Sequence, residues 1–169
     1  MLDKTWRLSF QWVIGPKEGG MTATTIHKGG CHCGGVRYQT SAALRPVLVC
    51  HCYDCMKTIG NSIAATAAPE DEVEITATTL QWYRSSSVAQ RGFCNHCGAS
   101  LFFRADGSGR LSISAGTLDD ASSLTCSGQI YAHAHHGFMP LPEGLEDLDD
   151  AYLRGDIGDT GKNTPEKNN

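Results

Sequence analysis

The chain lacks any long run of apolar residues and carries few charges. Of its 169 residues, 19% are charged, and the net charge at pH 7 is −4. Without a long apolar run no segment is suited to span a membrane. Without clustered Lys and Arg there is no broad nucleic-acid-binding surface. The low charge and the 19 glycines indicate a compact, turn-rich fold instead of a helical bundle.

The first residues also lack the pattern of a signal peptide. They carry Lys4, Arg7 and Lys17, and the apolar stretch at residues 8–14 is short and broken. We therefore expect a cytoplasmic protein in a reducing environment, where cysteines stay as thiols.

Cysteine is the residue that carries information here. Seven of the eight cysteines fall into three clusters, and Cys126 stands alone. The clusters are a first one with Cys31 and Cys33, a middle one with Cys50, Cys52 and Cys55, and a third one with Cys94 and Cys97. A disulfide framework is disfavoured because cysteines two residues apart make poor bridge geometry. Soft thiolates select zinc over calcium or magnesium, with iron as the minor alternative.

Seven thiolates divide into a closed four-thiolate site and a three-thiolate site with one open position. The spacing allows two pairings. Cys52 and Cys55 could join the third cluster, as in a zinc ribbon. Alternatively, the first and third clusters form the closed site and the middle cluster forms the open one. Glycines follow both outer clusters, and they favour the second pairing because they let backbone amides turn toward the sulfur atoms. From the residues alone both pairings stay open.

The chain from Gly29 onward alternates short strands and turns. Strands are expected at 35–40, 47–50, 63–68, 73–76, 80–84, 101–104 and 111–115. Residues 105–109 are predicted to form a hairpin turn, and residues 118–121 a turn or a helix start. The sequence therefore predicts a mainly β domain over residues 27–145. Residues 1–26 are expected to be an extension, disordered or an artefact of the start codon, and residues 146–169 a polar tail.

Four motifs follow one another in this domain. They are GGCHCGGVRY at 29–38, CHCxxCxKxxG at 50–60, RGFCxxCGxxL at 91–101 and AGTLD at 115–119. In this order they resemble the glutathione-dependent formaldehyde-activating enzyme family. The resemblance implies a β-tent fold of short antiparallel strands and few short helices, the fold type shared with the mammalian suppressor of Sec four.

The resemblance also implies a role for each clustered cysteine. Cys31, Cys33, Cys94 and Cys97 would hold a structural zinc, and Cys50, Cys52 and Cys55 a catalytic zinc, so two zinc ions per chain are expected. The implied activity is that of a carbon–sulfur lyase, which forms or cleaves S-hydroxymethylglutathione or a related thiol–aldehyde adduct. Its partners would be glutathione or an analogue and an aldehyde.

Glutathione carries two carboxylates, which call for cationic partners. Lys57, Arg84 and Arg91 are the candidates near the clusters, and Lys57 is the first choice because it lies two residues from a predicted ligand. Thr117 and Asp119 are expected to close a turn and not to line a pocket.

The remaining candidates are given structural roles. His32, His51 and His96 lie inside the clusters and are expected next to the ligands or at the surface. His133, His135 and His136 form a separate group, in which alternation would place His133 and His135 on one face of a strand. Cys126 is expected to be a buried or half-buried thiol.

Two other classes of function fit the same cysteines. One is a non-catalytic zinc-binding interaction module, in which the middle cluster is closed or empty. The other is a redox or metal sensor whose middle cysteines are reversibly oxidised. The zinc stoichiometry and the turnover separate these classes from a lyase.

Overall fold

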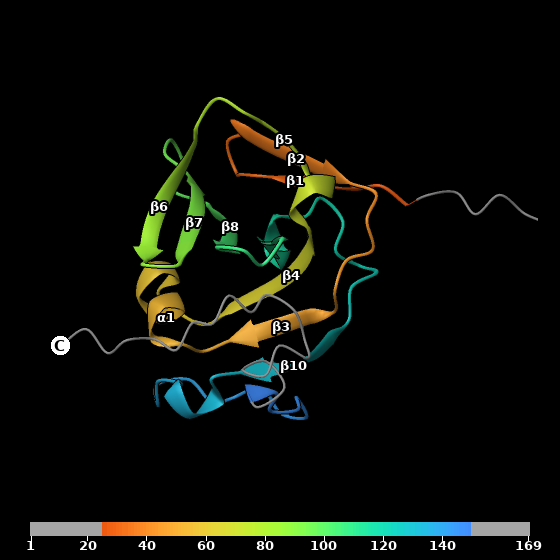
Figure 1. Cartoon of the computed structure of the whole chain (residues 1–169). Helices are drawn as coiled ribbons and strands as arrows, with labels where there is room; N and C mark the ends of the chain where they lie inside the picture. Colours follow the sequence, from red (N-terminus) through yellow and green to blue (C-terminus); the bar gives the residue numbers. More distant parts are fainter. Residues whose placement is uncertain (1–24, 150–169) are drawn as a thin grey trace, which may run out of the picture.

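The computed structural model of the chain describes residues 25–149 (Figure 1). The predicted extension and the predicted tail lie mostly outside this range. Ten strands lie within it: β1 His27–Gly30, β2 Val36–Thr40, β3 Val47–Cys50, β4 Ile63–Pro69, β5 Glu74–Ala77, β6 Leu80–Ser86, β7 Ala89–Cys94, β8 Ser100–Ala105, β9 Arg110–Ser114 and β10 Cys126–Ile130. The helices of this range are short: α1 Tyr53–Ile59 and the 3-10 turns Glu70–Glu72, Ala115–Thr117 and Ala132–Ala134. The predicted mainly β class is confirmed.

The strands form two sheets. A three-stranded antiparallel sheet has the order β1-β2-β5, and a seven-stranded sheet has the order β10-β3-β4-β9-β8-β7-β6. The larger sheet is antiparallel except where β10 runs parallel to β3. Figure 1 shows the small sheet across the top of the molecule and α1 below the ends of β6 and β7. The hairpin turn predicted at 105–109 joins β8 to β9.

The core lies between the two sheets. Tyr38 of β2 contacts Phe102 of β8 edge to face, with ring centroids 5.3 Å apart, and Trp82 of β6 stacks on the same ring. Leu101, Leu111 and Ile113 are fully buried around them. Since side chains alternate along a strand, the opposite face of the large sheet is free to carry a different set of residues.

Register assigns side chains of β6, β7 and β8 to the two faces. One row pairs Trp82 with Gly92 and Gly92 with Phe102, on the core side. The adjacent row pairs Tyr83 with Arg91 and Arg91 with Phe103. Arg91 therefore projects from the face of the large sheet that points away from the core. The middle cluster lies on this same face.

Several elements differ from the predicted ones. Strands β1, β7 and β10 and helix α1 were not predicted, whereas the other strands lie close to the expected ranges. Residues 118–121 do not start a helix, because Leu118 is extended after the 3-10 turn. The turn alternative holds there, since Asp120 accepts a hydrogen bond from the Ser122 amide at 2.8 Å.

The described chain stays paired with the sheet beyond residue 145. The Gln129 amide donates to the Glu146 carbonyl at 2.8 Å, and the Leu148 amide donates to the Gln129 carbonyl at 2.9 Å. Residues 146–148 thus cover the outer edge of β10. As for the membrane, no helix within residues 25–149 has the length and apolar character needed to cross one.

We expect replacement of Ile113 by Ala to destabilise the fold. Ile113 is fully buried, and removing such a side chain costs about 2–5 kcal/mol through lost burial and the cavity left behind. Ile26→Ala is the matched control, since Ile26 is exposed and its loss should change the free energy of unfolding by less than about 0.5 kcal/mol. Chemical denaturation at constant zinc measures both values, and equal effects would contradict the placement of the core.

Candidate metal centres

Two groups of cysteines come together in the structure. Cys31, Cys33, Cys94 and Cys97 form one group, here called the outer site, and Cys50, Cys52 and Cys55 form the other, the middle site. Within each group the sulfur atoms lie within 4.8 Å of one another. All eight cysteines are free thiols, so no disulfide forms. The zinc-ribbon pairing of Cys52 and Cys55 with the third cluster is not the one that the fold makes.

The outer site is built from two tight turns. Cys31 and Cys33 lie between β1 and β2, and Cys94 and Cys97 lie at the turn from β7 to β8. Gly34 and Gly98 follow these pairs with φ values of 81° and 76°, a left-handed conformation that side chains disfavour. The glycines let the chain reverse so that backbone amides face the sulfur atoms, as expected from their positions.

Hydrogen-bond donors surround the outer sulfur atoms. The Val36 amide donates to Cys31 Sγ at 3.2 Å, and the Cys97 amide is 3.5 Å from Cys94 Sγ. The Thr79 hydroxyl lies 3.1 Å from Cys94 Sγ and is the main reason why the pKa of Cys94 falls to about 5. The Ala99 amide is foremost in lowering the pKa of Cys97. These donors favour thiolates, the form that binds metal.

The sulfur spacing fits a tetrahedral ion. Zinc–sulfur bonds of about 2.3 Å at tetrahedral angles place two ligand sulfur atoms about 3.8 Å apart. In the outer site Cys33 Sγ lies 3.5 Å from Cys31 Sγ and 3.6 Å from Cys94 Sγ. In the middle site Cys55 Sγ lies 3.6 Å from Cys50 Sγ. Both donor sets therefore suit a soft divalent cation such as zinc.

The middle site combines a strand end with a helix start. Cys50 is the last residue of β3, Cys52 is the N-cap of α1, and Cys55 lies in the first turn of α1. The Cys52 sulfur accepts the Cys55 amide at 3.5 Å, as an N-cap oxygen would. The helix ends at Gly60, after two turns. Three sulfur atoms thus face one point, and no fourth Cys, His, Asp or Glu of the described residues joins them.

The three middle thiols divide their protons unequally. Hydrogen bonds from Cys50 and Cys55 lower the pKa of Cys52, helped by the Cys55 amide and the positive charge of Arg91. Hydrogen bonding to Cys52 and Cys55, together with burial, raises the pKa of Cys50. A bound divalent cation would hold all three sulfur atoms as thiolates and displace their protons.

Buried polar side chains support the middle site. His51 Nε2 is 3.2 Å from the Gln129 side-chain oxygen, and both residues are buried. The His51 amide donates to the Ile130 carbonyl at 3.0 Å, which ties the site to β10. Burial lowers the pKa of His51, so that its ring is neutral at pH 7. His51 is thus a neighbour of the ligands, as predicted, and not a ligand.

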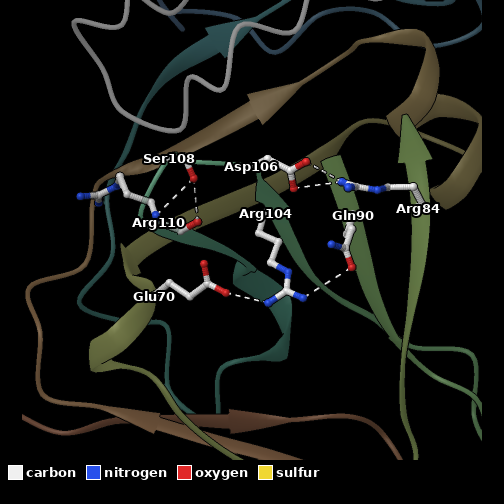
Figure 2. A network of polar contacts seen from close by, with 7 residues as sticks. All are labelled: Glu70, Arg84, Gln90, Arg104, Asp106, Ser108 and Arg110. Atoms are coloured by element: carbon white, nitrogen blue, oxygen red, sulfur yellow. Dashed lines mark hydrogen bonds and ion pairs between the residues drawn. The ribbon is translucent and has the colours of Figure 1, made fainter. Parts of the chain in front are cut away.

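The three predicted substrate cations occupy different environments. Lys57 is exposed on α1, with its amine 5.6 Å from the centre of the Tyr53 ring. Arg84 pairs with Asp106, as Figure 2 shows, and its Nη1 lies 2.8 and 2.9 Å from the two carboxylate oxygens. Arg91 is buried against Cys55. Register places Arg84 on the face of the sheet opposite to Arg91. The role of these residues in binding substrate stays a prediction.

Thr117 and Asp119 have structural contacts. The Thr117 hydroxyl donates to the Ser114 carbonyl at 2.7 Å and lies 2.9 Å from the Tyr38 hydroxyl. Asp119 forms an ion pair with Arg37, which lowers the pKa of its carboxyl group. These contacts agree with a role in closing the turn.

Two predictions for the C-terminal half are wrong. His133 lies in the 3-10 turn Ala132–Ala134 and not on a strand. Its Nδ1 is 2.9 Å from a carboxylate oxygen of Asp149. His135 follows the turn, with its Nδ1 2.9 Å from the Ala132 carbonyl. Cys126 is exposed and not buried, because it begins β10 where that strand is still open to solvent.

Tyr131 is a neighbour of the middle site that the sequence did not indicate. It follows Ile130, the residue paired with Cys50, and its φ of 57° is the one positive value of a non-glycine residue within residues 25–149. Burial raises the pKa of the Tyr131 phenol, and the charges of Cys50 and Cys52 add to the rise. The phenol therefore stays protonated. A left-handed tyrosine leaves no signal in the sequence, so only the structure shows this position.

The fold and the two cysteine groups define a mainly β protein whose thiols are arranged to bind metal. A comparison with family models then gives its relationship. The chain belongs to the glutathione-dependent formaldehyde-activating enzyme family, whose model matches residues 26–134. Among solved structures, a protein of Rhodobacter sphaeroides is 21% identical, with a TM-score of 0.46, and the match covers 59% of this chain and 99% of that one.

The two sites should respond differently to loss of one thiol. We expect Cys97→Ser to lower the free energy of unfolding by several kcal/mol (about 3 or more), because the outer ion would tie both sheets together. Cys52→Ser should leave the fold intact and remove one of two bound zinc ions. Metal analysis and chemical denaturation measure both effects. Equal destabilisation by the two substitutions would argue against a structural and a reactive site.

Proposed function

We propose that the chain is a zinc-dependent carbon–sulfur lyase that forms or cleaves an adduct between a thiol, such as glutathione, and formaldehyde or a related aldehyde. The observation that carries this proposal is the middle site, in which three sulfur atoms converge and no fourth described ligand closes the set. Membership of the family supports the substrate class. We also propose a reducing, cytoplasmic setting, since free thiols at both sites need one.

The middle site supplies what a thiol nucleophile needs. A zinc ion held by three cysteine thiolates offers one open position, at which an incoming thiol is stabilised as its thiolate near neutral pH. Cys50, Cys52 and Cys55 would hold that ion. The N-terminal end of α1 and the end of β3 place these sulfur atoms, so the incoming sulfur takes a defined direction. The chain contributes orientation as well as charge stabilisation.

The reaction is balanced without an oxidant or reductant. The thiol sulfur loses its proton and forms a bond to the aldehyde carbon. The electron pair of the carbonyl π bond moves to the oxygen, which takes up a proton to become the hydroxyl of the adduct. In the reverse direction the carbon–sulfur bond breaks, the carbonyl forms again and the sulfur regains a proton. The same site serves both directions because no group is consumed.

Among the cations proposed for the thiol's carboxylates, Lys57 has the most support. It is exposed to solvent on α1, the short helix that also carries Cys55. Arg84 would have to exchange its partner Asp106 for a substrate carboxylate. Arg91 already donates to a sulfur atom of the middle site. We therefore propose Lys57 as the first contact of the substrate and keep Arg84 and Arg91 as weaker candidates.

The direct test is exchange between S-hydroxymethylglutathione and free glutathione plus formaldehyde, followed by two-dimensional NMR on protein with two zinc ions per chain. We expect exchange above the spontaneous rate, and its loss in Cys52→Ser because the open site is then incomplete. Cys126→Ser is the matched control, since this exposed thiol lies outside both sites.

Two results would redirect the proposal. Two bound zinc ions without faster exchange would leave a metal-binding fold that acts on another substrate or serves as an interaction module. Exchange that persists in Cys52→Ser would mean that the middle site is not the reactive one.

Replacing Lys57 with Ala should raise the KM for glutathione by about fivefold, because an exposed charge-assisted contact contributes on the order of 1 kcal/mol. The kcat should change little, since the ligands of the ion are untouched. Lys28→Ala is the control, because Lys28 is also exposed but lies on β1 of the small sheet. Initial rates over a range of glutathione concentrations give both constants. An unchanged KM would remove Lys57 from the site.

A further inference from the structure

Arg91 is a buried cation whose partner is a sulfur atom. Its side chain projects from the middle of β7, and the residue is only 8% exposed. A guanidinium cannot lose its charge in a protein, so burial requires an anion nearby. Among the described residues no carboxylate forms an ion pair with Arg91. The group that meets it is the Cys55 sulfur of the middle site.

Both ends of the guanidinium point to the same atom. Arg91 Nη1 and Nη2 donate to Cys55 Sγ at 3.8 and 3.7 Å. The guanidinium carbon lies 5.2 Å from the centre of the Phe103 ring, which pairs with Arg91 across β7 and β8. The third nitrogen, Nε, is buried and has no hydrogen-bond partner within the described chain. The guanidinium group of Arg91 therefore packs against the Phe103 ring. Its only hydrogen-bond acceptor among the described residues is the Cys55 sulfur.

The three sulfur atoms of the middle site are consequently not equivalent. Apart from the contacts among the three sulfur atoms themselves, Cys55 Sγ receives two donors from a cation, and Cys52 Sγ receives one backbone amide at 3.5 Å. Cys50 Sγ lies 3.6 Å from Cys55 Sγ. A hydrogen bond from a cation withdraws electron density from a thiolate and lowers its nucleophilicity. Cys55 should therefore be the least reactive of the three.

We propose that Arg91 is a positioning residue that suppresses the nucleophilicity of Cys55, so that the aldehyde is attacked by the incoming thiol and not by the protein's own ligand. A divalent ion with three thiolates carries one net negative charge, which the guanidinium offsets. A fourth, substrate thiolate can then approach with less repulsion. This inference rests on the proposed function for its purpose, but the contact itself requires no turnover.

The test is alkylation of the zinc-loaded protein with iodoacetamide, in which a cysteine sulfur displaces iodide and becomes carbamidomethylated. Peptide mass spectrometry gives the rate at each cysteine. In Arg91→Met we expect the rate at Cys55 to rise about tenfold relative to the wild type, the size expected for loss of a charge-assisted contact. Arg91→Lys keeps the positive charge but loses the pair of guanidinium N–H donors, so the rise in the alkylation rate at Cys55 should be smaller.

Cobalt substitution gives a second readout that a merely structural role would not move. With two Co²⁺ ions per chain, the sulfur-to-metal charge-transfer band should shift to lower energy in Arg91→Met, because the sulfur electrons are held less tightly. Arg104→Met is the matched control. Arg104 also stacks on a ring, that of Trp82 at 4.1 Å, but it pairs with Glu70 on the other face of the sheet (Figure 2).

The outcomes separate this inference from the proposed function. Unchanged alkylation of Cys55 and an unchanged band in folded, metal-loaded Arg91→Met would overturn it, whatever the lyase assay shows. If Arg91→Met does not fold, Arg91→Lys decides, and wild-type rates at Cys55 in that variant would overturn it too. A rise at Cys55 in a protein that shows no exchange of the adduct would support the contact and count against the lyase.

Discussion

Seven thiols brought into two groups of sulfur atoms within 4.8 Å of one another are the constraint around which this fold is arranged. Thiolates at that distance repel one another, and hydrogen-bond donors surround the sulfur atoms at each site. Backbone amides and the Thr79 hydroxyl serve the outer site, whereas a helix N-terminus and Arg91 serve the middle one. Such donors reduce the repulsion, but a divalent cation removes most of it.

The outer site joins parts of the chain that are far apart in sequence. Cys33 and Cys94 are 61 residues apart, and their sulfur atoms lie 3.6 Å apart. One pair belongs to the hairpin of the small sheet and the other to the β7–β8 turn of the large sheet, so an ion there would clamp the two sheets over the aromatic core of Tyr38, Phe102 and Trp82. Closing a long loop is where a cross-link restricts the unfolded chain most.

The sequence was informative where chemistry is local and silent where it depends on register. Cysteine spacing and the glycines at 34 and 98 pointed to the two groups, because ligand pairs and their turns are contiguous. Strands β1, β7 and β10 were missed because each contains glycine, which lowers strand propensity. Gly29 is required in β1 because the chain passes close to Tyr38. A Cβ at this position would lie 2.2 Å from the Tyr38 hydroxyl oxygen. The contact of Arg91 with Cys55 joins residues 36 positions apart and required the pairing of β7 with β8.

Strand β7 links the two sites, because it contributes to both within four residues. Arg91 projects from one face toward Cys55, and Cys94 ends the strand as a member of the outer site. A strand held at Cys94 by a metal ion has little freedom to move Arg91 away from the middle site. The outer ion would then do more than stabilise the fold, since it would also set the position of the guanidinium. The proposed division between a structural and a reactive site is therefore one of chemistry, whereas the position of Arg91 at the middle site would depend on the outer one.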